Sequence, residues 1–105
     1  VVKLLIQAGT DVNAKDNAGD TALMGAALGG HQKAVKLLIQ AGADVNTKDN
    51  AGRIALMGAA SGGHQEVVKL LISTGVDVNA KDMYGITALM SAAYKGYTEI
   101  VKKGT

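Results

Sequence analysis

The chain nearly repeats itself at a spacing of 33 residues. Residues 16–48 and 49–81 are identical at 24 of 33 positions, and a third copy starting at residue 82 matches the second at 10 of its first 20 positions. Residues 1–15 match the back half of the copy at 49–81. A fixed period of this length predicts a stack of small units that pack on their neighbours, rather than one globular core. We therefore interpret the 105 residues as a single domain made of a partial repeat (1–15), two full repeats (16–48 and 49–81) and a partial repeat (82–105).

Each copy contains two helical patterns followed by a segment rich in turn-forming residues. In the first full copy, small alanines and Leu23 predict a helix over 21–29, and apolar residues at helical spacing predict a second helix over 31–41. The apolar residues of this second helix are Ala34, Leu37, Leu38 and Ala41. Glycine follows both helices, as suits the left-handed backbone conformation that ends a helix. Residues 43–52 lack a helical period and are rich in Asp, Asn and Gly, so we expect an extended, hairpin-like finger.

The composition is consistent with thin helical layers. Hydrophobic residues make up 48% of the chain, but aromatic residues only 3%, and Phe, Trp, Pro and Cys do not occur. The core must therefore be built from Ala, Leu, Val, Ile and Met.

The segment DNAGDTALMGAALGGHQKAVKLLIQAGADVNTK resembles the ankyrin repeat, a 33-residue unit with a Thr-Pro-Leu-His signature, a Gly-His turn, an apolar second helix and a Gly-Ala-Asp-Val-Asn tail. The resemblance implies an all-α solenoid of stacked helix-turn-helix units joined by hairpin-like fingers. Ala22 and Met24 replace the Pro and His of the signature, so the hydrogen bonds that this His makes in the family are expected to be missing. Ile54 stands where the other copies have Thr21 and Thr87. We expect the helix after Ile54 to lack a side-chain cap, and Ile54→Thr to stabilise the chain by about 1 kcal/mol.

The resemblance also implies a function. In ankyrin proteins the fingers and first helices line a concave face that binds other proteins, which predicts a non-catalytic protein-interaction module. Stacked fingers present side chains from consecutive repeats on one surface. The third copy differs most in chemistry from the others, and it contains all three tyrosines, Tyr84, Tyr94 and Tyr97. Tyrosine is enriched at binding hot spots. The predicted partner-binding residues are Asp20, Asn50, Arg53, Met83, Tyr84, Ile86, Tyr94 and Lys95.

Two other interpretations remain open from the sequence. The last copy of an array can diverge because selection on stacking is relaxed there. The near identity of two copies also fits a structural spacer, or an engineered repeat scaffold without a specific ligand.

The sequence predicts neither an enzyme nor a cofactor. His31 and His64 lie 33 residues apart, and stacked repeats would hold them about 8 to 10 Å from each other, too far for both to bind one zinc ion at ~2 Å. The recurring aspartates should occupy equivalent environments, whereas a general acid and base require different ones. The aspartates are therefore interpreted as turn residues, and no serine lies in a recognisable nucleophile motif.

The charge and hydropathy of the chain do not favour nucleic acid or a membrane as a partner. The net charge is +2, and the finger lysines at 15, 48 and 81 are each followed by Asp, so we expect a solvated surface rather than a nucleic-acid site. The apolar runs are too short for a membrane span. The chain does not open with a signal segment and has no cysteine, which favours an intracellular location over secretion.

The two ends lack the polar capping repeats that arrays use for solubility. We expect a fragment of a longer ankyrin array or an engineered chain, with partly exposed apolar residues at Val1, Val2, Leu4, Leu5 and Ile6. This open half-repeat suggests end-to-end self-association through the C-terminal end of another molecule.

Overall fold

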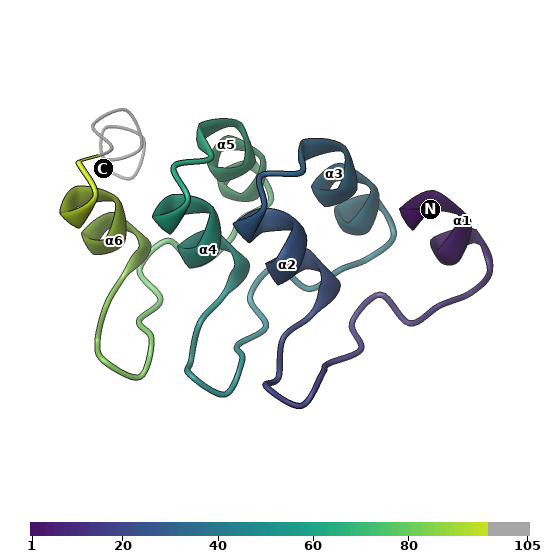
Figure 1. Cartoon of the computed structure of the whole chain (residues 1–105), viewed down its shortest axis with the longest axis horizontal. Helices are drawn as coiled ribbons and strands as arrows, with labels where there is room; N and C mark the ends of the chain where they lie inside the picture. Colours follow the sequence, from purple (N-terminus) through teal and green to yellow (C-terminus); the bar gives the residue numbers. More distant parts are fainter. Residues whose placement is uncertain (97–105) are drawn as a thin grey trace.

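The computed structural model describes residues 1–96, which form two rows of short helices. The six helices are α1 (Val2–Gln7), α2 (Ala22–Leu28), α3 (Gln32–Gln40), α4 (Ala55–Ser61), α5 (Gln65–Ser73) and α6 (Ala88–Tyr94). One row contains α2, α4 and α6, the other contains α1, α3 and α5, and the fingers project together from one side of the stack (Figure 1). No strand occurs within residues 1–96. The predicted all-α ankyrin-like solenoid is confirmed.

The predicted helices form within one residue of their expected ends. Thr21 and His31 are the N-cap residues of α2 and α3. Gly30 and Gly42, which follow these helices, adopt φ angles of 72° and 96°. These are left-handed conformations that other residues adopt at a cost, so the prediction for the helix ends is confirmed.

Aliphatic side chains of small and medium size fill the space between the rows. Leu23, Met57 and Leu71 are among the most buried large residues. Alanine at the contacts between first helices allows their backbones to approach closely, and four alanines have no exposed surface, at positions 27, 59, 60 and 92.

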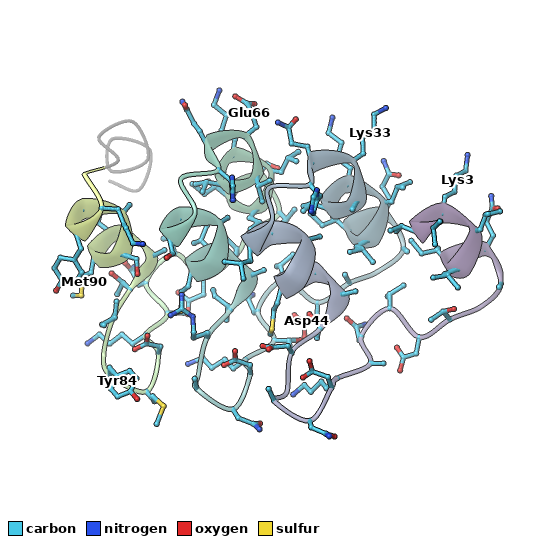
Figure 2. All side chains as sticks on the ribbon, in the orientation of Figure 1. Lys3, Lys33, Asp44, Glu66, Tyr84 and Met90 are labelled. Atoms are coloured by element: carbon cyan, nitrogen blue, oxygen red, sulfur yellow. The ribbon has the colours of Figure 1, made fainter. Side chains whose placement is uncertain are left out.

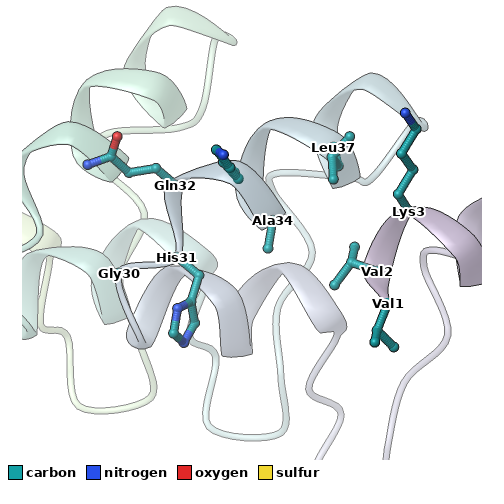
Figure 3. Close-up of a pocket in the computed structure, with 9 residues that line it drawn as sticks. Val1, Val2, Lys3, Gly30, His31, Gln32, Ala34 and Leu37 are labelled. Carbon is teal, nitrogen blue, oxygen red and sulfur yellow. The ribbon is translucent and has the colours of Figure 1, made fainter.

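The predicted apolar stripe of the second helix is only partly right. Val35 and Leu38 form the buried side of α3, whereas Ala34 and Leu37 are half-buried. The reason is the direction of packing, because Ala34 and Leu37 face α1 and line an open groove beside Val2 (Figure 3). Helical spacing identifies an apolar face but does not say which part of it a neighbour covers.

His64 fixes α4 and α5 against the preceding repeat. Its Nε2 atom lies 2.8 Å from the carbonyl oxygen of Leu28. The imidazole ring packs so closely over Gly30 that a Cβ atom there would come within 2.5 Å of the ring nitrogen Nδ1. The Gly-His turn is therefore a structural contact between neighbouring repeats.

The helix N-termini differ in how they are capped. Thr21 Oγ1 accepts a hydrogen bond from the Met24 N–H at 3.4 Å, and the Thr21 N–H donates to Met24 Sδ at the same distance. Met24 thus makes one hydrogen bond to the N-cap residue although it replaces the His of the signature, because a thioether sulfur is a weak acceptor. Thr87 caps α6 with one of these two bonds, because Thr87 Oγ1 accepts from the Met90 N–H at 3.3 Å. Ile54 makes no side-chain cap, as predicted, but it is buried in the core.

Candidate protein-interaction face

Each finger is a tight loop organised by an aspartate. Asp82 Oδ1 accepts hydrogen bonds from the backbone N–H groups of Tyr84 at 2.8 Å and Ile86 at 3.0 Å. Asp16 and Asp49 make the equivalent pairs of hydrogen bonds in the other two fingers. The interpretation of these aspartates as turn residues is confirmed, because each side chain accepts hydrogen bonds from its own loop.

Neighbouring fingers are joined through their backbones. The Asn50 N–H donates to the Ala18 carbonyl oxygen at 2.9 Å, and the Met83 N–H donates to the Ala51 carbonyl oxygen at 2.8 Å. The side chain of Asn50 adds a bond from Nδ2 to the carbonyl oxygen of Asn17 at 3.1 Å. The three finger tips are therefore held at a fixed spacing before any partner arrives.

The finger aspartates do not share one environment, contrary to the expectation from the repeat. In the first two fingers, the residue four positions after the finger aspartate faces the aspartate of the next finger. Arg53 therefore lies next to the buried carboxylate of Asp82, with Nη1 and Oδ2 3.9 Å apart, whereas the equivalent Asp20 lies next to Asp49. One substitution between copies thus changes an ion pair into a pair of like charges.

The pKa values of this like-charged pair move in opposite directions. The hydrogen bond with Asp49 raises the pKa of Asp20 above its ordinary value of 3.8, and burial and the charge of Asp49 add to the effect. Burial acts to raise the pKa of Asp49 as well, but hydrogen bonds from the Arg53 backbone, from Asp20 and from the Ala51 backbone outweigh it and leave the pKa lowered. Asp49 is thus the carboxylate that stays ionised, and Asp20 is the one that takes up a proton first.

The predicted contact residues separate into three groups. Met83, Tyr84 and Ile86 are on the third finger, where Met83 is 64% exposed, Tyr84 is 76% exposed and Ile86 is half-buried. Figure 2 shows Tyr84 on this finger, on the opposite side of the stack from Lys33 and Glu66.

Tyr94 and Lys95 form the second group, at the C-terminal end of α6, and both are exposed. The seven-residue α6 separates them from the finger by about 10 Å at 1.5 Å per residue. The third group is Asp20, Asn50 and Arg53, which are all engaged in contacts between fingers. Tyr97 lies outside the described residues.

A groove connects the third group with the first helices. It has a volume of about 560 Å³, and its wall includes Asp20, Arg53, Leu28, Met24 and Ser61. Leu28 is exposed although it is a large aliphatic residue. The groove therefore combines an apolar helix surface with a charged finger edge.

Met90 is an exposed residue on the same end of the stack that the sequence did not single out. It is 40% exposed, whereas its counterparts Met24 and Met57 are buried. The only signal in the sequence is the position of Met90 in the third copy, and within residues 1–96 no first helix follows α6.

The structure provides two further observations on chemistry. Within residues 1–96, the side chains of His, Asp and Glu do not gather in groups of three or more that could hold a metal ion. The helices of this described part are also too short to cross a membrane.

The comparisons with known proteins agree with the stacked helices, fingers and glycine turns. A family model described as ankyrin repeats (3 copies) matches residues 1–82 and 42–103. No curated protein matches the sequence significantly. Ankyrin repeats generally act as protein–protein interaction modules and are generally non-catalytic. The chain belongs to the ankyrin repeat family.

Proposed function

We propose that this chain binds a protein partner on the face formed by its fingers and first helices, and that the tip of the third finger is the main anchor. The observation that carries the proposal is the exposure of Met83 and Tyr84, at 64% and 76%, on a loop held by Asp82 and by the neighbouring finger. A finger backbone that is already held in place costs little entropy on binding, and Tyr84 adds a large contact area with few rotatable bonds, both of which favour affinity.

The groove beside Leu28 supplies the second part of the proposed face. Its apolar wall and the partly exposed guanidinium of Arg53 suit a partner segment that carries an apolar side chain next to a carboxylate. The contact between Arg53 and Asp82 stretches to 3.9 Å, so the guanidinium has donors left for a partner. Asp20 at the other edge of the groove disfavours a second acidic group there.

Tyr94 and Lys95 complete the proposed face as its rim. Both are exposed at the end of α6, and their distance from the finger means that a partner must span the length of this helix to touch both groups. We expect truncation of Tyr94 to weaken binding less than truncation of Tyr84, because rim residues are more hydrated than central ones.

The test compares three immobilised baits in the same cell lysate. The first is the unmodified chain and the second carries Met83→Ala with Tyr84→Ala. The third is a matched control with Lys33→Ala and Lys36→Ala, two exposed residues of α3. Figure 2 shows Lys33 on the opposite side of the stack from Tyr84. Ile86 is left unchanged because it is half-buried, so its loss would disturb folding. Circular dichroism establishes that all three baits are equally helical.

We expect a partner that the unmodified chain and the control capture equally, with at least tenfold less on the finger variant, as follows from the loss of a hot-spot residue. Equal capture by all three baits contradicts the assignment of the anchor to the third finger. If none of the baits captures a protein, the spacer or scaffold interpretation is favoured instead.

A further inference from the structure

The groove beside Leu28 lies in the middle of the stack, between α2 and α4 and below the first two fingers. Its volume is about 560 Å³, and its wall combines residues of both helices with Asp20, Asp49 and Arg53 of the fingers. The two helices pack on each other, and α4 also packs on α6. The shape of this groove is therefore set by contacts between neighbouring repeats.

A glycine keeps the floor of the groove open. Gly58 lies inside α4, where glycine is less favourable than alanine. A Cβ atom on Gly58 would lie 3.4 Å from Leu28 Cβ, so a methyl group there would occupy the space between the two helices. Because Gly58 has no side chain, the backbone of α4 forms the floor, and an apolar side chain of a partner has room to pack against it.

One edge of the groove carries negative charge that no ion pair balances within residues 1–96. Asp20 and Asp49 share a hydrogen bond, and this bond raises the pKa of Asp20 above its ordinary value of 3.8. In this described part, the carboxylates that form ion pairs are Asp82 and Glu66, so neither Asp20 nor Asp49 is paired with a basic side chain. Two carboxyl groups this close repel each other when both are ionised, and a cation from a partner relieves the repulsion.

The next position along the groove has the opposite charge. The side chain of Arg53 is 39% exposed, and its Nη1 atom is 3.9 Å from Asp82 Oδ2, so the guanidinium has donors left for a carboxylate. The contact of Arg53 with Asp82 and the contact of Asp20 with Asp49 occupy successive gaps between fingers. Stacked helices lie 8–10 Å apart, so the two charged positions are separated by about this distance.

An extended peptide segment matches this arrangement. Its side chains alternate between two sides at about 3.3 Å per residue, so three alternate residues form a row about 13 Å long on one side. When the central residue of the row is apolar and the outer two are long and charged, the row places one charge at each position and the apolar side chain on the groove floor.

We propose that the groove beside Leu28 selects an extended partner segment in which an apolar side chain lies between a cationic and an acidic one. The cation lies at Asp20 and Asp49, and the carboxylate lies at Arg53. The inference rests on the proposed protein-binding function and adds the charge pattern of the partner. Two acidic side chains would bring one of them against Asp20 and Asp49, and two basic ones would bring one against Arg53, so both patterns are disfavoured.

The experiment titrates the ¹⁵N-labelled chain with three five-residue peptides that have blocked ends. They are Lys-Thr-Leu-Thr-Glu (mixed), Glu-Thr-Leu-Thr-Glu (acidic) and Lys-Thr-Leu-Thr-Lys (basic). The backbone amides of Ala51 and Arg53 report on the site, because both donate to Asp49 Oδ1. NMR spectra at low salt, with up to about 5 mM peptide, detect the weak affinities expected of short peptides.

Two variants change the same amount of charge at different places. Asp20→Arg copies onto the first finger the pairing that Arg53 has with Asp82, and turns the acidic edge of the groove into a basic one. Glu66→Arg is the control at an exposed position of α5, which Figure 2 shows on the opposite side of the stack from Tyr84. Dispersed amide spectra establish that both variants fold.

We expect the unmodified chain and Glu66→Arg to bind the mixed peptide about threefold or more tightly than either of the others, since an exposed ion pair is worth up to about fivefold in affinity. Asp20→Arg should prefer the acidic peptide by a similar factor. Equal binding of the three peptides overturns the proposal, as does tightest binding of the basic peptide to the unmodified chain. An unchanged preference in Asp20→Arg, or the absence of any shift, overturns it as well.

The capture experiment on the third finger has a separate outcome. Capture of a partner through Met83 and Tyr84 without discrimination among the peptides refutes the charge pattern alone. Preference for the mixed peptide when no bait captures a protein supports the charge pattern, although the third-finger anchor then fails.

Discussion

At the scale of single residues, Asp20 and its counterpart Arg53 each face the aspartate of the next finger. They show how one substitution changes the electrostatics of a repeat. Arg53 meets Asp82 across two fingers, and the equivalent Asp20 meets Asp49. Because the pKa of Asp20 is raised in the folded state, its ionisation opposes folding. This cost to the free energy of folding is absent at pH values below 3.8, the ordinary pKa of the carboxyl group. It is fully present at pH values above the raised pKa of Asp20.

We therefore predict that Asp20→Asn raises the free energy of unfolding at pH 7, since it removes the repulsion from Asp49. The gain should disappear below pH 3.8, where Asp20 is protonated in both the folded and the unfolded chain. Urea unfolding at both pH values measures the difference.

Asp20→Arg is the matching variant, because it copies the ion pair of the next finger and should add up to about 1 kcal/mol at an exposed site. A lower urea midpoint for Asp20→Asn at pH 7 would show that the contact with Asp49 is favourable and contradict the prediction.

At the scale of elements, α4 combines a missing cap with a buried residue. Ile54 precedes this helix without a side-chain hydrogen bond to it, but its side chain is buried in the core. The Met57 N–H, which a threonine would cap, already donates to the Ile54 carbonyl oxygen at 3.1 Å. The expectation from the sequence took account of the missing cap, but not of the burial of Ile54 or of the hydrogen bond that the Met57 N–H already makes.

We predict that Ile54→Thr lowers the free energy of unfolding by about 0.5 to 1 kcal/mol, opposite in sign to the expectation from the sequence. The variant loses two buried carbon groups at about 0.8 kcal/mol each and regains about 1 kcal/mol from the cap. Ile54→Val has the same shape as the threonine variant without its hydroxyl, so the difference between the two measures the cap. An increase in the urea midpoint for Ile54→Thr would mean that the cap outweighs the burial.

At the scale of the whole molecule, the stack should not be equally stable along its length. Each repeat contacts only its neighbours, so its stability depends on how many of them cover it. The α4 helix has five buried residues and lies between α2 and α6, whereas α1 has none and packs mainly on α3.

We predict that amide hydrogens of α1 exchange with solvent at least a hundredfold faster than those of α4, because α1 opens at a cost far below that of global unfolding. Hydrogen exchange followed by NMR measures both helices in one sample. Equal protection of α1 and α4 would indicate that the six helices open as a single unit and would contradict the prediction.

Much of the fold could be predicted from the sequence because the signals are local. The helix ends follow from glycines such as Gly30 and Gly42, whose backbone conformation depends on the residue itself. The finger loops follow from aspartates that bond to the backbone within four residues. The exposure of Met83 and Tyr84 at a finger tip could also be predicted from the sequence, since finger positions recur every 33 residues.

The sequence by itself thus determined the type and ends of the helices within a copy, the position of the fingers, and the stacking of the copies as a solenoid. The tertiary structure alone decided which copy of a repeated residue is buried. Ala22 and Ala55, like Met90 and Met57, occupy the same place in an Ala-Leu-Met segment but have opposite exposure. The physical reason is that burial in a solenoid comes from the adjacent repeat, and the presence of that neighbour is not encoded in the residue or in its own helix.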